Sequence, residues 1–498
     1  MKALLIIPPF TQINTTYPSV TQLSGFLNSK GHDVFSVDLS LNVFLRIFCS
    51  NGLKAISKAI KNKKTDDEYI NRSISLFERY VEIIDSVIYF LQGNNPTYAN
   101  VLVKDGYIPQ GKNFPNDEYN NSAFGDVGIY DRAKHYAALM IGDIYSVINA
   151  VVTPHYGLSK YAESIAQTPP EFGGLLNEVN RERNIIEKFI IEETEKVIQQ
   201  YKPSFVGFSI PFPGNLLSGL ISAKYIKDKY KNIKISFGGG YVNTELRKLS
   251  DKRIFDFVDY VTYDDGELPL LQILNNLENN SNKEWIRTLT IENGELVYLD
   301  NAVNNIFPFK DLPKPSYKGI EIGKYVSMLE MLNPMHRLWS DGYWNKLSVA
   351  HGCYWQKCTF CDITLDYIKR YSPANTVNFV KIIGEIKTET GKNTFHFTDE
   401  AAPPSKLKEL ALELLKQKSN ICWWGNIRFD KAFNDDLCRL LSYSGCIAVS
   451  GGIEIAEPRL LELINKGVTI EQAAQVTNNF KKAGILVHSY LMYGYPTQ

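Results

Sequence analysis

The chain has 498 residues, and at about 150 residues a domain this length predicts two to four domains. Apolar residues make up 44% of the chain and charged residues 22%, which is ordinary for a folded protein and argues against large-scale disorder. The 54 basic and 54 acidic residues cancel, so no overall charge would attract nucleic acid or an acidic membrane.

The chain begins with MKALLIIPPF, a short apolar run that ends at two prolines and reads as a first strand. The run is too short for a signal peptide, and no later segment approaches the roughly 18 apolar residues of a membrane span. We therefore expect a cytoplasmic protein without membrane association. Thiols stay reduced in that compartment, so clustered cysteines indicate metal binding rather than disulfides.

Strand and helix patterns alternate over residues 2–38, and the same alternation resumes at 204–275. Short apolar strands separated by helices predict a parallel sheet that is covered on both faces. The intervening residues 41–200 are mostly helical in pattern. We predict an α/β, Rossmann-like domain over 1–275 with a large helical insertion at 41–200. In the last helix of this block, helical spacing places five apolar residues on one face: Ile186, Phe189, Ile190, Val197 and Ile198.

Polar or glycine residues follow several strands of this domain. Ser209 ends one strand, Gly238–Gly240 follow the next, and the sequence DDGE at 264–267 follows a third. In a parallel sheet these turns lie at the carboxyl edge, where such folds bind ligands. Three consecutive glycines would let a bulky ligand approach the backbone closely.

A hairpin is expected at 287–301, with its turn at Asn293–Gly294, within a hairpin and linker segment at 276–340. A second strand–helix series then occupies 341–498. Its strands recur every 25–45 residues or so and end in polar residues or glycine, which fits a (β/α) barrel or part of one.

Three of the seven cysteines lie in one short stretch, HGCYWQKCTFCD, after the first strand of the second series. Cys353, Cys358 and Cys361 suit an iron–sulfur cluster in which one iron has no protein ligand. They also suit zinc, with His351 or Asp362 as a fourth ligand, and three buried structural thiols are the third possibility. Thiolates bind both iron–sulfur clusters and zinc, so the loop alone leaves these alternatives open.

Tyr354, Trp355 and Phe360 stand between these cysteines, and an apolar surround of this kind restricts solvent around a cluster. The remaining candidates have weaker signals. We expect a buried core role for Cys49, Cys422, Cys438 and Cys446. We expect a core or lining role for His396 and His488.

With these motifs the chain resembles the radical S-adenosylmethionine (radical SAM) enzymes, and within them the branch that has an N-terminal cobalamin-binding domain. In that family three cysteines after the first barrel strand hold a [4Fe–4S] cluster, and its fourth iron binds SAM. The resemblance covers nearly the whole chain, and the helical insertion is its weakest part. It departs from the family in having Cys-x4-Cys-x2-Cys instead of Cys-x3-Cys-x2-Cys, and in lacking Gly-Gly-Glu after the second strand.

The resemblance implies roles for single residues. Cys353, Cys358 and Cys361 would be the cluster ligands. The SAM contacts it implies are Phe360 beside the last cysteine, Asp399 and Glu400 for the methionine amine, Arg428 for the carboxylate, and Glu454 for the ribose hydroxyls or the amine. A bidentate pair with a carboxylate is the geometry to which a guanidinium is suited.

The segments IIPPF, VGFSIPFP, GGGYVN and DDGE look like the cobalamin domain of this family. The chain has no Asp-x-His-x-x-Gly motif, whose histidine binds cobalt in many cobalamin proteins, and we expect His32 to be structural. The resemblance therefore implies cobalamin with its own base displaced. The residues expected to cradle it are Ser209, Gly238, Gly239 and Gly240.

The implied function is a methyltransferase that acts on an unactivated carbon. A 5′-deoxyadenosyl radical would take a hydrogen atom from the substrate, and methylcobalamin would then deliver the methyl group. The alternatives are a radical rearrangement or cyclisation without methyl transfer, and a non-catalytic cobalamin- or metal-binding sensor. The implied partners are a small-molecule or peptide substrate and an electron donor such as flavodoxin or ferredoxin, with no nucleic acid and no membrane.

The sequence ends just after the fifth strand of the second series, whereas the family's partial barrel has six strands. A fifth strand without a neighbour would expose an unpaired edge and lose part of the packing of its apolar side chains. We therefore expect the native protein to continue by roughly 100 residues or more, or another chain to supply the missing strand. The apolar side chains concerned are Ile485, Leu486, Val487, Leu491 and Met492.

Overall fold

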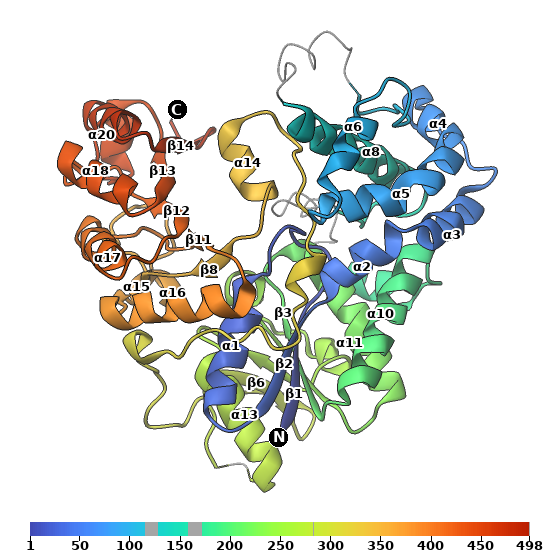
Figure 1. Cartoon of the computed structure of the whole chain (residues 1–498). Coiled ribbons are helices and arrows are strands. Elements are labelled where there is room, and N and C mark those ends of the chain that lie inside the picture. Colours follow the sequence, from blue (N-terminus) through green and yellow to red (C-terminus); the bar gives the residue numbers. More distant parts are fainter. Residues whose placement is uncertain (115–127, 158–171, 282, 498) are drawn as a thin grey trace. The chain divides into compact units, whose positions relative to one another are not determined.

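The computed structural model describes residues 1–114, 128–157, 172–281 and 283–497, so the parts of the predicted insertion at 115–127 and 158–171 lie outside the described residues. The chain divides into two compact units (Figure 1). The first comprises Met1–Tyr263, Ile273–Asp300 and Lys318–Tyr343. The second comprises Asp264–Gln272, Asn301–Tyr317 and Trp344–Gln498.

Among the described residues of the first unit, a seven-stranded sheet has the order β2-β1-β3-β4-β5-β6-β7. Strands β1 to β5 are parallel, and β6 and β7 are antiparallel to their neighbours. The strands are β1 (Lys2–Ile7), β2 (Asp33–Asp38), β3 (Phe205–Ser209), β4 (Lys234–Gly238), β5 (Tyr260–Thr262), β6 (Thr288–Glu292) and β7 (Glu295–Leu299). Residues Ala3–Ile7 of β1 are at most 2% exposed. Both faces of this strand are covered, which explains its continuous apolar run.

The predicted hairpin forms from β6 and β7, with Asn293 and Gly294 at its turn, both at positive φ. It pairs with β5 and so extends the sheet of the first unit. The sequence analysis placed these residues in a separate hairpin and linker segment at 276–340. In the structure, Asn301–Tyr317 instead belongs to the second unit and Lys318–Tyr343 returns to the first.

Between β2 and β3 the described residues form helices and no strand, as the sequence predicted for this block. The helices are α2 (Leu39–Ile47), α3 (Ser50–Ile60), α4 (Glu68–Ser75), α5 (Phe77–Leu91), α6 (Ala99–Leu102), α8 (Ile129–Val151), α9 (Phe172–Asn180) and α10 (Ile185–Tyr201). The other helices with residues in the first unit are α1 (Pro18–Ser29), α11 (Leu216–Lys229), α12 (Gly240–Thr244), α13 (Glu267–Asn279) and α14 (Pro334–Ser340).

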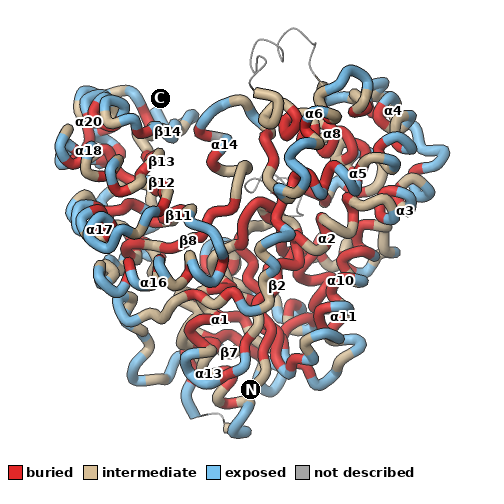
Figure 2. Tube along the Cα trace, in the orientation of Figure 1, coloured by how far each residue is buried: buried red, intermediate tan, exposed pale blue. Residues whose placement is uncertain are grey.

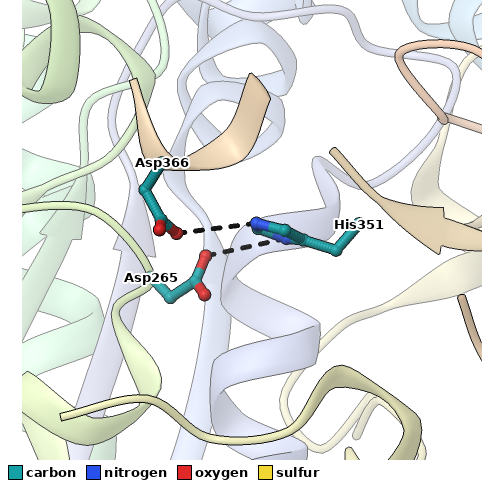
Figure 3. Close-up of side chains that lie close together, drawn as sticks. All are labelled: Asp265, His351 and Asp366. Carbon is teal, nitrogen blue, oxygen red and sulfur yellow. Dashed lines mark ion pairs between the residues drawn. The ribbon is translucent and has the colours of Figure 1, made fainter. Parts of the chain in front are cut away.

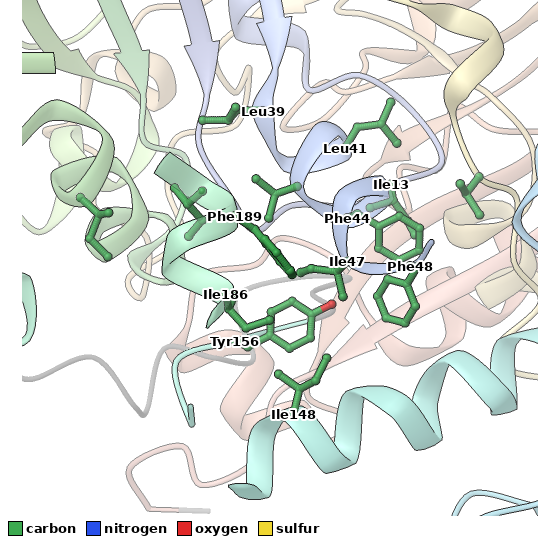
Figure 4. Packing of buried hydrophobic residues seen from close by; sticks show 14 of the residues in the cluster. Ile13, Leu39, Leu41, Phe44, Ile47, Phe48, Ile148, Tyr156, Ile186 and Phe189 are labelled. Atoms are coloured by element: carbon green, nitrogen blue, oxygen red, sulfur yellow. The ribbon is translucent and has the colours of Figure 1, made fainter. Parts of the chain in front are cut away.

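The helical block packs on the same hydrophobic core as the sheet. Figure 4 shows Phe44 and Phe48 of the α2 region beside Ile148, Tyr156 and Phe189 from later in the block. The five apolar residues predicted to share one face of α10 are all at most 4% exposed, which confirms that prediction. Each large apolar side chain buried in this way contributes about 1.5–3 kcal/mol to folding. The insertion is therefore part of the first unit and not a separate subdomain.

The second unit contains a five-stranded sheet in the order β14-β13-β12-β11-β8, in which all neighbours are parallel. Its strands are β8 (Asn345–Leu347), β11 (Thr394–Phe397), β12 (Cys422–Ile427), β13 (Cys446–Glu454) and β14 (Leu486–Leu491). A small two-stranded ribbon joins β9 (Ala350–His351) and β10 (Ser372–Pro373). Strands occur at all five predicted places, and the predicted α/β fold class is confirmed.

Helices of the second unit lie along one side of this sheet (Figure 1). They include α16 (Thr376–Thr390), α17 (Pro404–Lys416), α18 (Asp435–Tyr443) and α20 (Ile470–Lys482). The shorter helices of this unit are α15 (Asp366–Lys369) and α19 (Pro458–Leu463). Alternate residues Phe395 and Phe397 of β11 are fully buried, and Phe397 packs on Phe379 of α16. Figure 2 shows the buried residues gathered in both sheets and in the helix faces against them. In the part of the chain that the structure describes, no helix has the length and apolar character needed to cross a membrane.

Candidate functional site

The cysteine loop, residues 352–361, leaves the sheet of the second unit just after β8 and the short strand β9. Gly352 has φ +74°, and a Cβ atom there would lie 2.3 Å from the Arg370 carbonyl oxygen. Only glycine avoids both the strained backbone and this collision. The Cys353 N–H then donates to the Ile368 carbonyl at 3.1 Å. The loop is therefore fixed at its first residue by the chain that returns to β10.

Cys353, Cys358 and Cys361 are all free and partly buried. The Cys361 N–H donates to the Cys358 carbonyl at 3.2 Å, which closes the second half of the loop. Burial raises the pKa of Cys361, and the nearby charges of Cys358, Cys353 and Glu400 raise it further. Three thiols that influence one another in this way need a cation to become thiolates together.

The separation of the thiols bears on the metal alternatives. Sulfurs on one tetrahedral zinc lie about 3.8 Å apart, given a zinc–sulfur distance of about 2.3 Å. Among the described residues, the single set of three potential ligands with all atoms within 4.8 Å of one another does not include these cysteines. Thiols on one cluster bind different irons and so lie farther apart. Thiolates are ligands of both iron–sulfur clusters and zinc, and three of them on one loop fit a cluster in which one iron has no protein ligand.

Arg428 follows β12 and is 4% exposed. Its Nη2 donates to the Lys466 carbonyl at 2.6 Å, and its Cζ lies 4.1 Å from the ring centre of Trp355. Its Nε and Nη1 are buried without a hydrogen-bond partner. Buried guanidinium donors left unpaired are costly, so they mark a place where an anionic or polar group can bind. This is what the predicted contact with the SAM carboxylate requires, and that contact stays a prediction.

Glu454 is the last residue of β13, and it has φ +66°, which is uncommon for a residue with a side chain. The register between β13 and β14 shifts between Gly452 and Glu454. Such a bulge at the end of a strand re-aims the side chain. The Glu454 carboxylate accepts a hydrogen bond from Lys466 Nζ at 2.8 Å. Its predicted contact with the ribose or the amine of SAM stays a prediction.

Asp399 follows β11 and is 2% exposed. Its carboxylate accepts the N–H groups of Val349 at 3.0 Å and Ala350 at 2.7 Å. These hydrogen bonds lower the pKa of Asp399, but burial outweighs them and raises it to about 7. The carboxylate thus holds the chain just before the cysteine loop. Glu400 is exposed at the same edge, and the assignment of both residues to the methionine amine is untested.

The other side of the cysteine loop rests on residues 464–467, which follow α19. Phe360 is 37% exposed, and Lys466 Nζ lies 5.6 Å from the centre of its ring. Gly467 has φ +67°, and a Cβ atom there would lie 2.1 Å from the ring of Trp355. The loop therefore packs closely on a turn that stands about a hundred residues later in the sequence.

A second polar group lies beside the loop, around His351 (Figure 3). Its Nε2 is 3.5 Å from an Asp366 oxygen and its Nδ1 is 3.9 Å from an Asp265 oxygen. Arg370 Nη2 donates to both carboxylates, to Asp366 at 3.1 Å. The guanidinium already supplies the positive charge between the two acids. We therefore interpret this group as an internal ion-pair network that ties β9 to α15 and to the DDGE segment, not as a metal site.

The predicted cobalamin contacts lie at the carboxyl edge of the first unit's sheet. Ser209 Oγ is 2.7 Å from Ser19 Oγ. Gly239 has φ +106°, and a Cβ atom there would lie 2.8 Å from backbone atoms of Ile210. A Cβ atom on Gly240 would lie 3.0 Å from the Pro211 carbonyl oxygen. These glycines are thus required by the packing of two turns on each other, and their role toward cobalamin stays a prediction.

His32 does not lie free at this edge. It is 6% exposed, its Nδ1 lies 3.3 Å from the N-terminal nitrogen, and its Nε2 lies 3.2 Å from Asn275 Oδ1. Burial lowers the pKa of His32. These contacts agree with the structural role predicted for it. Of the four cysteines expected in the core, Cys438 and Cys446 are buried, whereas Cys49 and Cys422 are only partly buried.

Sequence reasoning missed Lys466, Arg370 and the part that Asp265 plays in the second unit. Lys466 stands in INKG, within a segment that supplied Glu454 as a candidate, yet a lysine between a helix and a loop gives no signal of burial. Asp265 was expected to face a ligand of the first unit, and its ion pairs with Arg370 and His351 appear only in the fold.

Comparison with known proteins shows what this part of the chain is similar to. Residues 347–498 match the family model described as the radical SAM superfamily. An uncharacterized methyltransferase from Pyrococcus horikoshii is 24% identical over 317 residues, which is 63% of this chain and 65% of that protein. An uncharacterized protein from Methanopyrus kandleri is 31% identical over 105 residues, which is 20% of each chain. The chain thus spans just under two thirds of the first relative and a fifth of the second.

A solved structure is similar over the whole chain. It is that of TsrM from Kitasatospora setae, a radical S-adenosylmethionine methyltransferase with cobalamin and a [4Fe–4S] cluster bound. The match covers 100% of this chain and 70% of TsrM, with 12% identity and a TM-score of 0.54. At this identity the likeness concerns the fold. As the sequence predicted, residues 347–498 match the radical SAM superfamily, and the fold of the whole chain is similar to that of TsrM.

Proposed function

We propose that the protein is a cobalamin-dependent radical SAM enzyme, and specifically a methyltransferase that acts on an unactivated carbon. The observation that carries the proposal is the site in the radical SAM domain. Three partly buried thiols lie on one loop at the carboxyl edge of a parallel sheet, beside a buried arginine with unpaired donors. The names of the Pyrococcus relative and of TsrM as methyltransferases support the choice of reaction.

The proposal gives the residues of the second unit separate tasks. Cys353, Cys358 and Cys361 hold the [4Fe–4S] cluster, and Arg428 offers Nε and Nη1 to the carboxylate of SAM. Asp399 fixes the approach to the loop through two backbone N–H groups. When bound, the cluster and SAM supply a 5′-deoxyadenosyl radical, and cobalamin supplies the methyl group. The protein positions these groups and keeps water away from them.

The first unit is proposed to hold cobalamin at the carboxyl edge of its parallel strands, near Ser209 and Gly238–Gly240. The fold and the position of these turns support this. The histidine nearest in sequence, His32, is already held by Asn275 and the N-terminus. Bound cob(II)alamin should therefore give an electron paramagnetic resonance (EPR) spectrum without nitrogen superhyperfine splitting. Nitrogen splitting, or no cobalamin binding at all, would contradict this part.

The remaining partners follow from the proposed chemistry. The substrate is a small molecule or a peptide, and the reducing electron comes from a donor such as flavodoxin or ferredoxin. We propose a cytoplasmic location. We also propose no nucleic-acid or membrane partner, because the 54 basic and 54 acidic residues balance.

The decisive experiment is anaerobic reconstitution with iron, sulfide and cobalamin, followed by SAM and a reductant. Cleavage of SAM to 5′-deoxyadenosine would show the radical chemistry and exclude a sensor. Formation of S-adenosylhomocysteine in the same reaction would show that the methyl group of SAM is also transferred, because its loss leaves that product. Deoxyadenosine without S-adenosylhomocysteine would favour a radical rearrangement or cyclisation. If neither product forms, the proposal is contradicted.

A further inference from the structure

The turn at 464–467 is attached to the cysteine loop at several points. The Thr359 N–H donates to the Ile464 carbonyl at 3.0 Å, and Trp355 Nε1 donates to the Asn465 carbonyl at 3.0 Å. Arg428 holds the next carbonyl, that of Lys466. A small core anchors the turn from behind, and it consists of Ile455, Leu460, Leu461 and Ile464. The backbone of Lys466 therefore has a fixed position relative to the loop.

The side chain of Lys466 is buried as well. It is 8% exposed and ends 2.8 Å from Glu454 Oε1, and its Nζ lies 5.6 Å from the ring centre of Phe360. Phe360 stands between Cys358 and Cys361 in the loop. Burial of an ammonium group is costly unless a partner compensates for it. The carboxylate of Glu454 offsets this cost and holds the ammonium group near the ring of Phe360 in the cysteine loop.

Two buried cations lie around the loop. They are Arg428 and Lys466, and Glu454 is the anion paired with one of them. The surroundings of these buried groups are less polar than water, so their charges interact more strongly than the charges of exposed groups do.

We propose that Lys466 is a positioning residue that sets the reduction potential of the iron–sulfur cluster, with Glu454 as the countercharge that orients it. This inference rests on the proposed function, because it requires a cluster on Cys353, Cys358 and Cys361. Reduction adds negative charge to the cluster, so a fixed cation stabilises the reduced form. The carboxylate of Glu454 works against it, which gives the two residues opposite effects on one measurable quantity.

The experiment is a dye-mediated redox titration of the reconstituted full chain, followed by the EPR signal of the reduced cluster, without SAM. Lys466→Met should make the potential more negative than in the wild type, and Glu454→Gln should make it less negative. The double variant should return close to the wild type, and Lys466→Arg, which keeps the charge, should stay there. Opposite signs from the two partners would not arise from general damage to the loop.

Lys357→Met is the matched control. It removes the same charge from the same loop, next to Cys358 in sequence, but Lys357 is exposed and its charge is screened by water and salt. Its potential should equal that of the wild type. If Lys466→Met and Glu454→Gln also keep the wild-type potential, the inference is wrong while the proposed function stands. If the wild type takes up no cluster, the proposed function fails first.

If only the Lys466→Met variant loses the cluster, the inference can still be tested. Lys466→Arg and Glu454→Gln would then carry the test, since the first must keep the potential and the second must raise it. A lowered or unchanged potential in Glu454→Gln would overturn the assignment.

Discussion

The carboxyl edges of the two parallel sheets differ in what remains available to a ligand. In the second unit, Arg428 keeps two buried donors without a partner, beside three thiols on one loop. In the first unit, Ser209 bonds to Ser19, and the space beside Gly239 is filled by Ile210. Both edges looked like binding sites in the sequence.

The difference concerns the kind of residue that carries each signal. A cysteine in a close cluster has a chemical role that the fold alone seldom needs, whereas a glycine at positive φ is needed by the backbone itself. Glycine-rich turns therefore predict a tight structure first and a ligand second. The predictions below test whether the two edges really differ in this way.

The largest effect is expected from Cys358→Ala. The variant should lose the broad brown absorbance and the bound iron of the reconstituted protein, because a cluster with three protein ligands cannot spare one. Its far-ultraviolet circular dichroism should match the wild type, since the thiol is partly buried but small. About one equivalent of zinc in the wild type, with iron never incorporated, would show that the site belongs to another metal.

The next effect concerns the support of the loop. Gly467→Ala should destabilise the protein by several kcal/mol, because left-handed backbone costs about 1–2 kcal/mol for a residue with a side chain and overpacking against Trp355 adds about 1–3. Gly484→Ala is the matched control, since Gly484 also has positive φ but nothing within 4 Å of its Cβ position. Urea unfolding and iron content measure the difference. Equal losses in the two variants would show that the contact with Trp355 does not matter.

Gly239→Ala tests the carboxyl edge of the sheet in the first unit. We expect it to lower the free energy of unfolding by about 1–3 kcal/mol even without cobalamin, because the backbone there suits glycine alone. Gly294→Ala, at positive φ in an open hairpin turn, should cost less. A Gly239→Ala protein of wild-type stability that fails to bind cobalamin would instead show that the glycine serves the ligand.

The last effect is a pH dependence of stability. Burial raises the pKa of Asp399 to about 7, above its ordinary value, so the folded state holds an extra proton between about pH 4 and pH 7. Raising the pH through this window should therefore lower the free energy of unfolding, by about 1.4 kcal/mol for each unit by which the pKa is raised. Asp399→Asn should flatten this slope in urea titrations at several pH values. If the pH dependence of the free energy of unfolding is unchanged in Asp399→Asn, a group other than Asp399 causes it.

Much of the fold was open to prediction because it depends on local pattern. A short continuous apolar run such as that of β1 is typical of a strand covered on both faces, and the apolar face of α10 follows from helical spacing. The three cysteines could be found for a similar reason, since their types and spacing carry the chemistry. The hairpin at Asn293–Gly294 was visible too, but its membership in the first sheet depends on pairing with β5.

What the sequence by itself determined is therefore the α/β class, the positions of the strands, and the loop of Cys353, Cys358 and Cys361. Only the tertiary structure decided which charges surround that loop. Lys466 is buried against Glu454, and Arg428 is left with free donors, because a turn more than a hundred residues after the cysteines packs under Trp355. Burial and pairing of a charge depend on neighbours distant in sequence, and no spacing rule along the chain records them.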